Sequence, residues 1–259
     1  MQSYGKVSII TPSYNCGRFI EETINSVINQ TYQDWELLFQ DDCSTDNTSE
    51  LVRLLAKRDT RIKYACNPVN SGAAITRNNA LKRANGRWIA FLDSDDLWKP
   101  DKLEKQLNFM VKNNYHFSYH EYVEIDENSS ELGVYVSGIK KVGKYGMYCC
   151  CWPGCLSVIY DVKVVGLLQI ADVKKNNDTA MWLKVVEKAQ CYLLKENLGF
   201  YRRRKGSITP SSIKDRIMWH YILFRSIGKR KIISIFWMCM NVLGNMTKKI
   251  FFVRKYKIA

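Results

Sequence analysis

The sequence predicts an α/β fold with a mainly parallel, Rossmann-like sheet flanked by helices. Over the first 100 residues, short apolar runs that favour strands alternate with longer segments of helical periodicity. Acidic clusters at residues 41–42 and 93–96 follow two of the predicted strands. The carboxyl ends of parallel strands are where open α/β sheets bind ligands, so we expect the functional site at that edge.

The elements of the first half follow from apolar periodicity and from turn residues. Val7–Ile10 is a β-branched run stopped by Thr11 and Pro12, and residues 18–29 carry apolar side chains at helical spacing. A second helix is expected after a cap formed by residues 44–46. The predicted order is strand 7–10, helix 18–29, strand 36–39, helix to about residue 55, strand 62–65, helix 73–84 and strand 88–92.

The second half has a weaker pattern. Residues 117–125 alternate weakly, residues 131–144 are polar and interrupted by glycine, and residues 156–160 form a probable strand pattern. Residues 176–178 precede a helical segment that contains Trp182. From Arg202 onward the chain becomes strongly basic, and we expect a helical tail there.

The net charge of +14 lies entirely in this tail. Residues 1–201 hold 24 Lys and Arg against 24 Asp and Glu, whereas residues 202–259 hold 15 against Asp215 alone. A basic tail indicates an anionic partner, either nucleic acid or lipid head groups. Its apolar run at 232–243 is shorter than the roughly 20 residues of a membrane-spanning helix, so it is expected to lie on a membrane rather than cross it.

The cysteines and the start of the chain indicate a reducing compartment. The nine cysteines have neither the regular spacing of a secreted disulfide framework nor a zinc pattern, and we expect reduced, mostly buried thiols. The first residues lack the charged and apolar regions of a signal peptide. The expected location is the cytoplasm.

The cluster Asp93-Ser94-Asp95-Asp96 places three carboxylates directly after a buried strand. A set of oxygen ligands without His or Cys suits a hard cation, Mg²⁺ or Mn²⁺, with positions left for phosphate oxygens. A solvated turn before a helix is the alternative explanation for this cluster taken alone.

Four motifs together resemble the family 2 glycosyltransferases. They are the residues 7–15 (VSIITPSYN), 41–46 (DDCSTD), 70–72 (NSG) with Arg77-Asn78, and 91–96 (FLDSDD), in the family's order and spacing. The resemblance continues more weakly through residues 154–157, 177–178 with Trp182, and 201–202 with Ser207, and it is absent from about the last 50 residues.

This resemblance implies a GT-A fold and inverting, non-processive transfer of one sugar from a nucleoside diphosphate sugar, with a UDP-sugar expected. It implies a catalytic domain at 1–205, divided into a nucleotide-sugar half (1–98) and an acceptor half (99–205), followed by a basic amphipathic tail at 206–259. By their match to the family motifs, Asp95 and Asp93 are the expected metal ligands, Asp41 reads a uracil-type base, and Asp96 supports the cluster. The expected nucleotide-sugar site comprises Pro12, Tyr14, Asn15, Asp41, Asp42, Gly72, Arg77, Asp93 and Ser94.

Asp178 matches the family's catalytic carboxylate and is the expected base, although Asn177 stands where the family usually has Glu. From the sequence alone Asp178 could instead cap the following helix. Asn177 and Trp182 are expected on the acceptor side, with a core position as the alternative for Trp182.

The expected partners are a nucleoside diphosphate sugar, a saccharide or polyprenyl-linked acceptor, and an anionic membrane surface at the inner face of the cytoplasmic membrane. The pathway expected is bacterial surface polysaccharide synthesis. Packing of the tail on the protein itself or on a homodimer partner is the alternative to membrane binding, and no nucleic acid is expected. The functional alternatives are a sugar nucleotidyltransferase and a catalytically silent nucleotide- or RNA-binding module. A nucleotidyltransferase should have a Gly-rich loop after its first strand, and residues 11–15 do not form such a loop. A dinucleotide-binding oxidoreductase lacks support, because no G-x-G-x-x-G follows the first strand.

Overall fold

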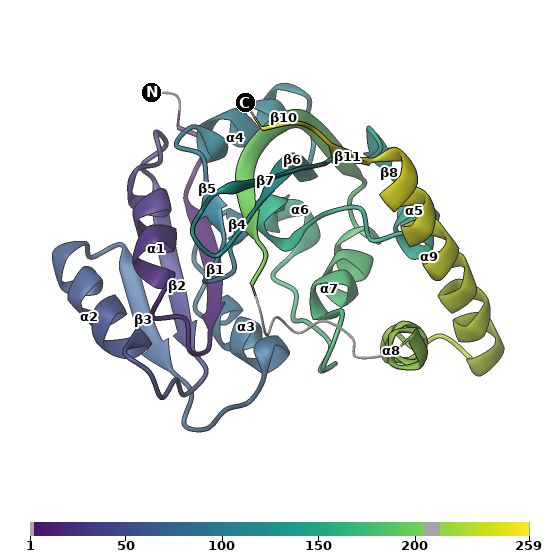
Figure 1. Ribbon diagram of the computed structural model, residues 1–259, viewed down its shortest axis with the longest axis horizontal. Coiled ribbons are helices and arrows are strands. Elements are labelled where there is room, and N and C mark those ends of the chain that lie inside the picture. Colours follow the sequence, from purple (N-terminus) through teal and green to yellow (C-terminus); the bar gives the residue numbers. More distant parts are fainter. Residues whose placement is uncertain (1–2, 205–212, 259) are drawn as a thin grey trace.

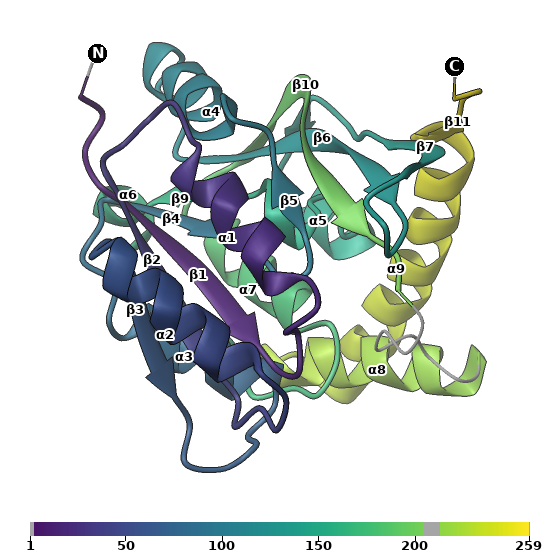
Figure 2. The same cartoon turned by 60° about the vertical axis from the view of Figure 1, so that its left-hand side comes forward.

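A computed structural model of the chain describes residues 3–204 and 213–258. The described residues form one sheet of eleven strands with helices on both faces (Figures 1 and 2). The boundary predicted at residues 205 and 206, and Ser207, lie outside the described residues.

The first half alternates strands and helices as its periodicity predicts. Its elements are β1 (Val7–Ser13), α1 (Ile20–Ile28), β2 (Trp35–Asp41), α2 (Thr48–Arg58), β3 (Ile62–Cys66), α3 (Ala73–Leu81) and β4 (Trp88–Phe91). Strands β4, β1, β2 and β3 are parallel neighbours in that order, with Ile9 paired to Leu37 on one side and to Ala90 on the other. This arrangement confirms the predicted α/β fold.

The second half extends the sheet with mixed strand directions. Its elements are β5 (Leu97–Trp98), α4 (Lys102–Lys112), β6 (Phe117–Ile125), β7 (Glu131–Val136), β8 (Lys141–Val142), α5 (Lys144–Cys149), the 3₁₀ turn η1 (Cys155–Ser157), β9 (Ile159–Asp161), α6 (Val162–Val165), α7 (Asn177–Val185), β10 (Cys191–Arg202), α8 (Ile213–Ser226), α9 (Lys231–Phe251) and β11 (Val253–Lys255). The strand predicted at 156–160 is shorter, because a 3₁₀ turn occupies residues 155–157.

The sheet separates two hydrophobic cores. On one face α1, α2 and α4 pack against the sheet, and on the other face α3, α5 and α7 do so, with α8 packed on α7. Successive strand residues alternate between the cores, since Ile9 belongs to the first and Ile10 to the second. Burial on both faces explains why β1, β2 and β4 are rich in apolar residues, whereas the edge strand β3 is partly exposed.

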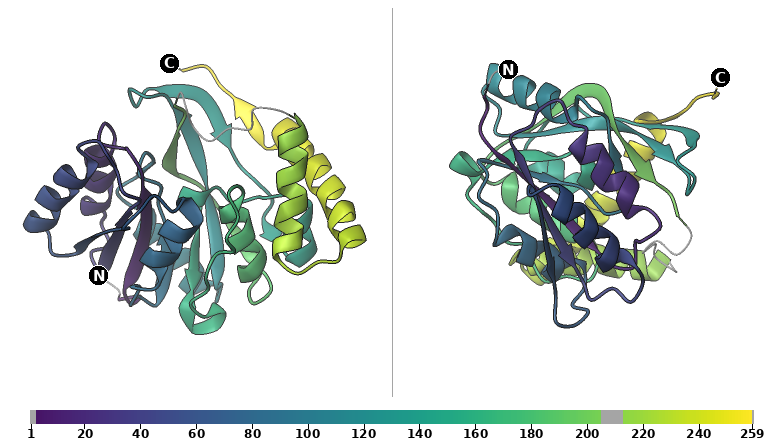
Figure 3. Two further views of the ribbon diagram at one scale, coloured as in Figure 1. Left: turned by 90° about the horizontal axis from the view of Figure 1, so that it is seen from below. Right: turned by 90° about the vertical axis from the view of Figure 1, so that its left-hand side faces the viewer.

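The C-terminal elements pack on the acceptor half of the chain. Leu223 and Phe224 of α8 are fully buried in the second core, α9 lies against α5, and β11 pairs with β7 at the edge of the sheet. Figure 3 shows α8 and α9 side by side along the outer edge of the molecule. No helix among the described residues has both the length and the apolar character needed to cross a bilayer.

Candidate active site

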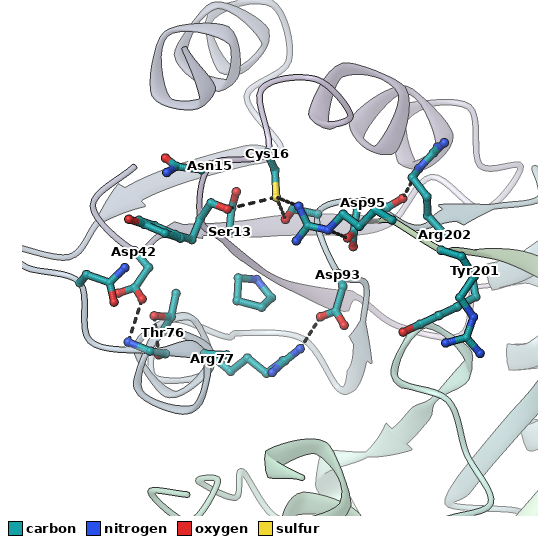
Figure 4. Close-up of a pocket in the computed structure, with 18 residues that line it drawn as sticks. Ser13, Asn15, Cys16, Asp42, Thr76, Arg77, Asp93, Asp95, Tyr201 and Arg202 are labelled. Carbon is teal, nitrogen blue, oxygen red and sulfur yellow. Dashed lines mark hydrogen bonds and ion pairs between the residues drawn. The ribbon is translucent and has the colours of Figure 1, made fainter. Parts of the chain in front are cut away.

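A cleft of about 650 Å³ opens at the carboxyl ends of β1, β2 and β4, where the sequence predicts a ligand site. The end of β10 closes its other side. Figure 4 shows the lining side chains. They are Pro12, Ser13, Tyr14, Asn15, Cys16, Asp42, Asn70, Gly72, Ala73, Thr76, Arg77, Asp93, Ser94, Asp95, Tyr201, Arg202, Arg203 and Arg204.

The loop after β1 is tied to the loop after β2. The backbone N–H of Asn15 donates to Ser44 Oγ (2.9 Å), and Asn15 Oδ1 accepts from the N–H of Thr45 (2.8 Å). Asn15 adopts a left-handed backbone conformation (φ 49°), which asparagine tolerates better than most residues. The two loops are thereby held together, and Tyr14 is left 46% exposed at the cleft.

Asp42 faces the cleft and Asp41 does not. The carboxylate of Asp42 accepts from the backbone N–H groups of Ser71 and Gly72 (2.8 Å each), which draws the loop before α3 toward the cleft. Asp41 is 1% exposed, and its carboxylate accepts from Ser44 Oγ (2.5 Å) and from the Tyr64 hydroxyl (3.0 Å). Asp41 therefore supports the loop from behind, and of the two carboxylates it is Asp42 that lines the cleft.

Arg77 lies buried at the base of the cleft between two partners from different parts of the chain. Its guanidinium donates to Asp93 and, over 2.5 Å, to Asn177 Oδ1. Burial disfavours its charge, but the carboxylates of Asp93 and Asp178 outweigh this, and the pKa of Arg77 is raised. The guanidinium is therefore a fixed positive charge that joins the acidic cluster to the start of α7.

The rest of the acidic cluster is held by arginines at the end of β10. Arg204 Nε lies 2.8 Å from Asp95 Oδ2, and Arg202 donates its Nε–H to the Asp95 carbonyl (2.7 Å) and its backbone N–H to Asp96 Oδ1 (2.9 Å). Burial raises the pKa of Asp95 against the opposing effect of Arg204. Burial and the neighbouring carboxylates raise the pKa of Asp96 well above its usual range.

The carboxylates of the cleft could hold a divalent cation only if phosphate oxygens complete its ligands. Among the described residues, no group of three or more His, Cys, Asp or Glu side chains is arranged to hold a metal. Mg²⁺ commonly takes one or two protein carboxylates and completes its shell with waters and substrate phosphates. Asp93 and Asp95, both partly exposed and both at the cleft, match that pattern.

Asp178 lies in the first turn of α7, where its Oδ1 accepts from the N–H of Thr179 (2.6 Å). Asn176, in a left-handed conformation, is the residue that precedes the helix, so Asp178 is not the N-cap. Burial raises the pKa of Asp178, and the charge of Arg77 partly opposes this. Asp178 is not among the residues that line the cleft, but Arg77 lies close enough for the two charges to interact.

Trp182 does not face the acceptor side, and that expectation is wrong. The side chain is fully buried, with its ring 5.0 Å from that of Phe91 in a T-shaped contact and 6.0 Å from that of Phe117. Trp182 lies on the side of α7 that packs against the sheet, and it belongs to the second core. Asn177 is buried as well, and its contact is with Arg77.

The basic run that begins at Arg202 resembles the rest of the tail in composition, so the predicted site omits several cleft residues. Tyr201 and the three arginines that follow it line the cleft, as do Cys16 and Thr76. The weak resemblance at residues 201–202 was the available signal. Ser94 was predicted and lies in the cleft, with its hydroxyl 3.0 Å from Cys16 Sγ.

One family model and several known proteins match this chain over most of its length or about half of it. The family model described as glycosyl transferase family 2 matches residues 8–144. The chain is 36% identical over 244 residues to TuaG of Bacillus subtilis (strain 168), a candidate teichuronic acid biosynthesis glycosyltransferase, covering 94% of this chain and 96% of that protein. It is 41% identical over 213 residues to WfgD of Escherichia coli, a UDP-Glc:alpha-D-GlcNAc-diphosphoundecaprenol beta-1,3-glucosyltransferase, covering 81% of each chain.

Solved structures share the fold. Staphylococcus aureus TarS (residues 1–349) in complex with UDP-GlcNAc superposes with a TM-score of 0.72 at 20% identity, covering 95% of this chain and 75% of that one. The Pyrobaculum calidifontis mannosyltransferase PcManGT, in complex with GDP-Man and Mn²⁺, superposes with a TM-score of 0.61 at 17% identity, covering 95% and 73%. At these identities the likeness establishes the GT-A fold alone.

Proposed function

The chain belongs to glycosyltransferase family 2, and from that premise we propose that it transfers one sugar, with inversion, from a nucleoside diphosphate sugar to a saccharide or lipid-linked acceptor. The observation that carries the proposal is the pair Asp93 and Asp95 at the end of β4, facing a cleft whose other walls supply four arginines. Carboxylates suit a metal ion and arginines suit phosphate oxygens, so a cleft that contains both suits a metal-bound diphosphate. We place the activity in the synthesis of a bacterial surface polysaccharide, as the names of TuaG and WfgD suggest.

The donor is proposed to be a UDP-sugar with its base between the loops after β1 and β2. Tyr14 is exposed there, and the Asp42 carboxylate faces the cleft to accept an imide N–H. We assign this role to Asp42 rather than to Asp41, because Asp42 lines the cleft and Asp41 does not. The choice of nucleotide is supported by WfgD, a UDP-Glc-dependent glucosyltransferase, and by TarS, whose structure holds UDP-GlcNAc.

Asp95 and Asp93 are proposed to hold Mn²⁺ or Mg²⁺ together with the donor diphosphate. The bound ion would neutralise charge that develops on the leaving diphosphate. Arg77 lies beside Asp93 and would donate to phosphate oxygens. Arg204 forms an ion pair with Asp95 in this structure. We propose that this ion pair opens when the cation binds, and that the guanidinium of Arg204 then contacts the diphosphate.

Asp178 is proposed as the base. The acceptor hydroxyl oxygen attacks the anomeric carbon, the bond from that carbon to the diphosphate oxygen breaks, and Asp178 takes the hydroxyl proton. Its raised pKa makes it a better proton acceptor than an ordinary aspartate. Asn177 accepts from the guanidinium of Arg77 and so positions it. This contact links the proposed donor site to the first turn of α7, which carries Asp178.

The acceptor is proposed to be lipid-linked, with the protein working at the inner face of the cytoplasmic membrane. The name of WfgD specifies an undecaprenol-linked acceptor, and the C-terminal helices of this chain lie on the acceptor half. A basic C-terminal segment is suited to a surface of anionic lipids.

A panel of nucleotide sugars with Mn²⁺ or Mg²⁺ tests the proposal. Release of nucleoside diphosphate from one donor, dependent on the acceptor and the metal, is the expected result. Release of pyrophosphate from a nucleoside triphosphate and a sugar phosphate would instead identify a nucleotidyltransferase. Metal-dependent nucleotide binding without turnover of any donor would leave only a binding module and would refute the assignment of Asp178.

A further inference from the structure

Helix α9 turns its apolar side toward solvent. Side chains on that side recur every three or four residues, which places them along one stripe of the helix. Ile232 is 82% exposed and Ile250 is 71% exposed, although both are among the most hydrophobic residue types. The outer stripe consists of Ile232, Phe236, Cys239, Leu243, Met246 and Ile250, all exposed.

The opposite side of α9 combines polar residues with Trp237, which packs on Tyr148, and it is fixed to the protein. Asn241 is fully buried and donates its Nδ2–H to the Tyr148 carbonyl (2.8 Å), and Lys248 Nζ donates to the carbonyls of Cys151 (3.0 Å) and Trp152 (2.7 Å). At Gly244 an added Cβ would lie 2.0 Å from the Cys149 carbonyl oxygen, so only glycine allows this close approach. Rotating the helix to bury the stripe would break these contacts. The outward orientation of the outer stripe is therefore built into the fold.

A contiguous exposed apolar surface on a globular protein indicates a binding partner. The helix contains 21 residues and is therefore about 30 Å long. The outer stripe runs along the length of the helix, so contact along its side is the geometry that uses the whole stripe.

The charge around the outer stripe favours anionic lipid over a second copy of the chain. Exposed Arg230 and Lys231 stand at the start of α9, and exposed Lys249 and Arg254 stand at its end. Residues 213–258 contain Asp215 as their single acidic residue against 11 basic residues. Pairing two copies through α9 would bring like charges together, whereas lipid phosphates would neutralise them.

We propose that the outer stripe of α9 inserts in the plane of an anionic membrane and attaches the acceptor half of the protein to it. The proposal deepens the membrane location given under Proposed function and does not depend on which sugar is transferred. Helix α9 packs on α5 and lies at the edge of the molecule far from α2 of the nucleotide half (Figure 1). A lipid-linked acceptor would then enter from the side of the protein that contacts the bilayer.

Flotation of the full-length protein with vesicles of phosphatidylcholine and phosphatidylglycerol tests this inference. The variant Ile232→Gln/Leu243→Gln/Ile250→Gln alters exposed positions and should fold, while its vesicle partition coefficient should fall by about 100-fold or more. A matched variant, Leu54→Gln/Val111→Gln, replaces exposed apolar residues of α2 and α4 and should float like the parent. Part of the parental binding should persist in high salt, because burial of apolar side chains is not screened.

Two outcomes would overturn the inference. In the first, the triple variant floats as well as the parent. In the second, light scattering shows that the parent is a stable dimer that fails to float and that the triple variant is a monomer, so a second copy covers the stripe. Should the triple variant misfold, an environment-sensitive fluorophore on Cys239, in a Cys66→Ser background, supplies the same test. Its emission should rise and shift to the blue on vesicles, and an unchanged spectrum would contradict insertion.

Binding is measured without donor or acceptor, so failure of this inference is distinguishable from failure of the proposed transferase activity. Loss of flotation in the triple variant should leave nucleoside diphosphate release to a water-soluble acceptor analogue intact. A parallel loss of both would show that the substitutions disturb the catalytic half rather than a lipid-binding surface.

Discussion

Replacing Asp178 by Asn removes a base while keeping the local structure. The Asn carbonyl oxygen can still accept from the N–H of Thr179, now 2.6 Å from Asp178 Oδ1, so the first turn of α7 is retained. Arg77 keeps its contacts with Asp93 and Asn177. Donor affinity should therefore change by about threefold or less, because no contact with the donor is lost.

The transfer step should slow by about 10²- to 10⁴-fold, the usual cost of a lost general base, which corresponds to roughly 2.7–5.4 kcal/mol in the barrier. In the parent protein kcat should decline as the pH falls through the raised pKa of Asp178, because the protonated carboxyl cannot accept a proton. This decline should disappear in Asp178→Asn. Nucleoside diphosphate release at a series of pH values measures both effects.

Stability gives a second readout with a defined sign. The folded-state pKa of Asp178 is raised, chiefly by burial, so the folded protein binds this proton more tightly than the unfolded chain does. The associated stabilisation is present below the unfolded pKa and is lost as the pH rises through the folded one. Asp178→Asn should therefore increase the unfolding temperature at neutral pH, with a smaller gain at low pH. Near-normal turnover with an unchanged pH profile would refute the role given to Asp178.

Four further predictions concern the cleft and the core. Asp95→Ala should reduce UDP affinity in the presence of Mn²⁺ by about tenfold or more, measured by calorimetry, and an unchanged affinity would exclude Asp95 as a ligand. Arg204→Gln should increase Mn²⁺ affinity in the absence of nucleotide, because the competing charge on Asp95 is removed; weaker binding would contradict that pairing. Asp42→Asn should raise the KM for the donor by about tenfold, and equal donor kinetics of Asp42→Asn and the parent would remove Asp42 from base recognition. Trp182→Ala should lower the free energy of unfolding by about 3–5 kcal/mol in urea titrations, as expected for a core residue.

The parallel half of the fold could be predicted because β1, β2 and β4 are buried on both faces and contain short apolar runs. β10 was missed for the opposite reason. Residues 195–197 of this strand are polar and partly exposed, and the pairing with β6 is irregular on both sides of Asn197. Without that strand, Arg202–Arg204 appeared to start the tail, whereas the end of β10 brings them to the cleft.

The exchange of Asp41 and Asp42 has a local cause. At a strand end, adjacent side chains point to opposite sides, and motif matching alone does not determine which of two consecutive carboxylates faces the ligand. The hydrogen bonds from Ser44 and Tyr64 to Asp41, and from the Ser71–Gly72 loop to Asp42, distinguish them. For α9 the composition indicated a basic, apolar segment, but the direction of its apolar side depends on contacts with residues 148–152.

The configuration of the new glycosidic bond tests the central claim most directly. With the preferred donor and acceptor, NMR of the product should show the anomeric configuration opposite to that of the donor, with one nucleoside diphosphate released per bond formed. Removal of divalent cations should stop the reaction, and Mn²⁺ or Mg²⁺ should restore it. Retained configuration, or full activity in the presence of a chelator, would contradict a site in which Asp93 and Asp95 hold the metal and Asp178 takes the proton.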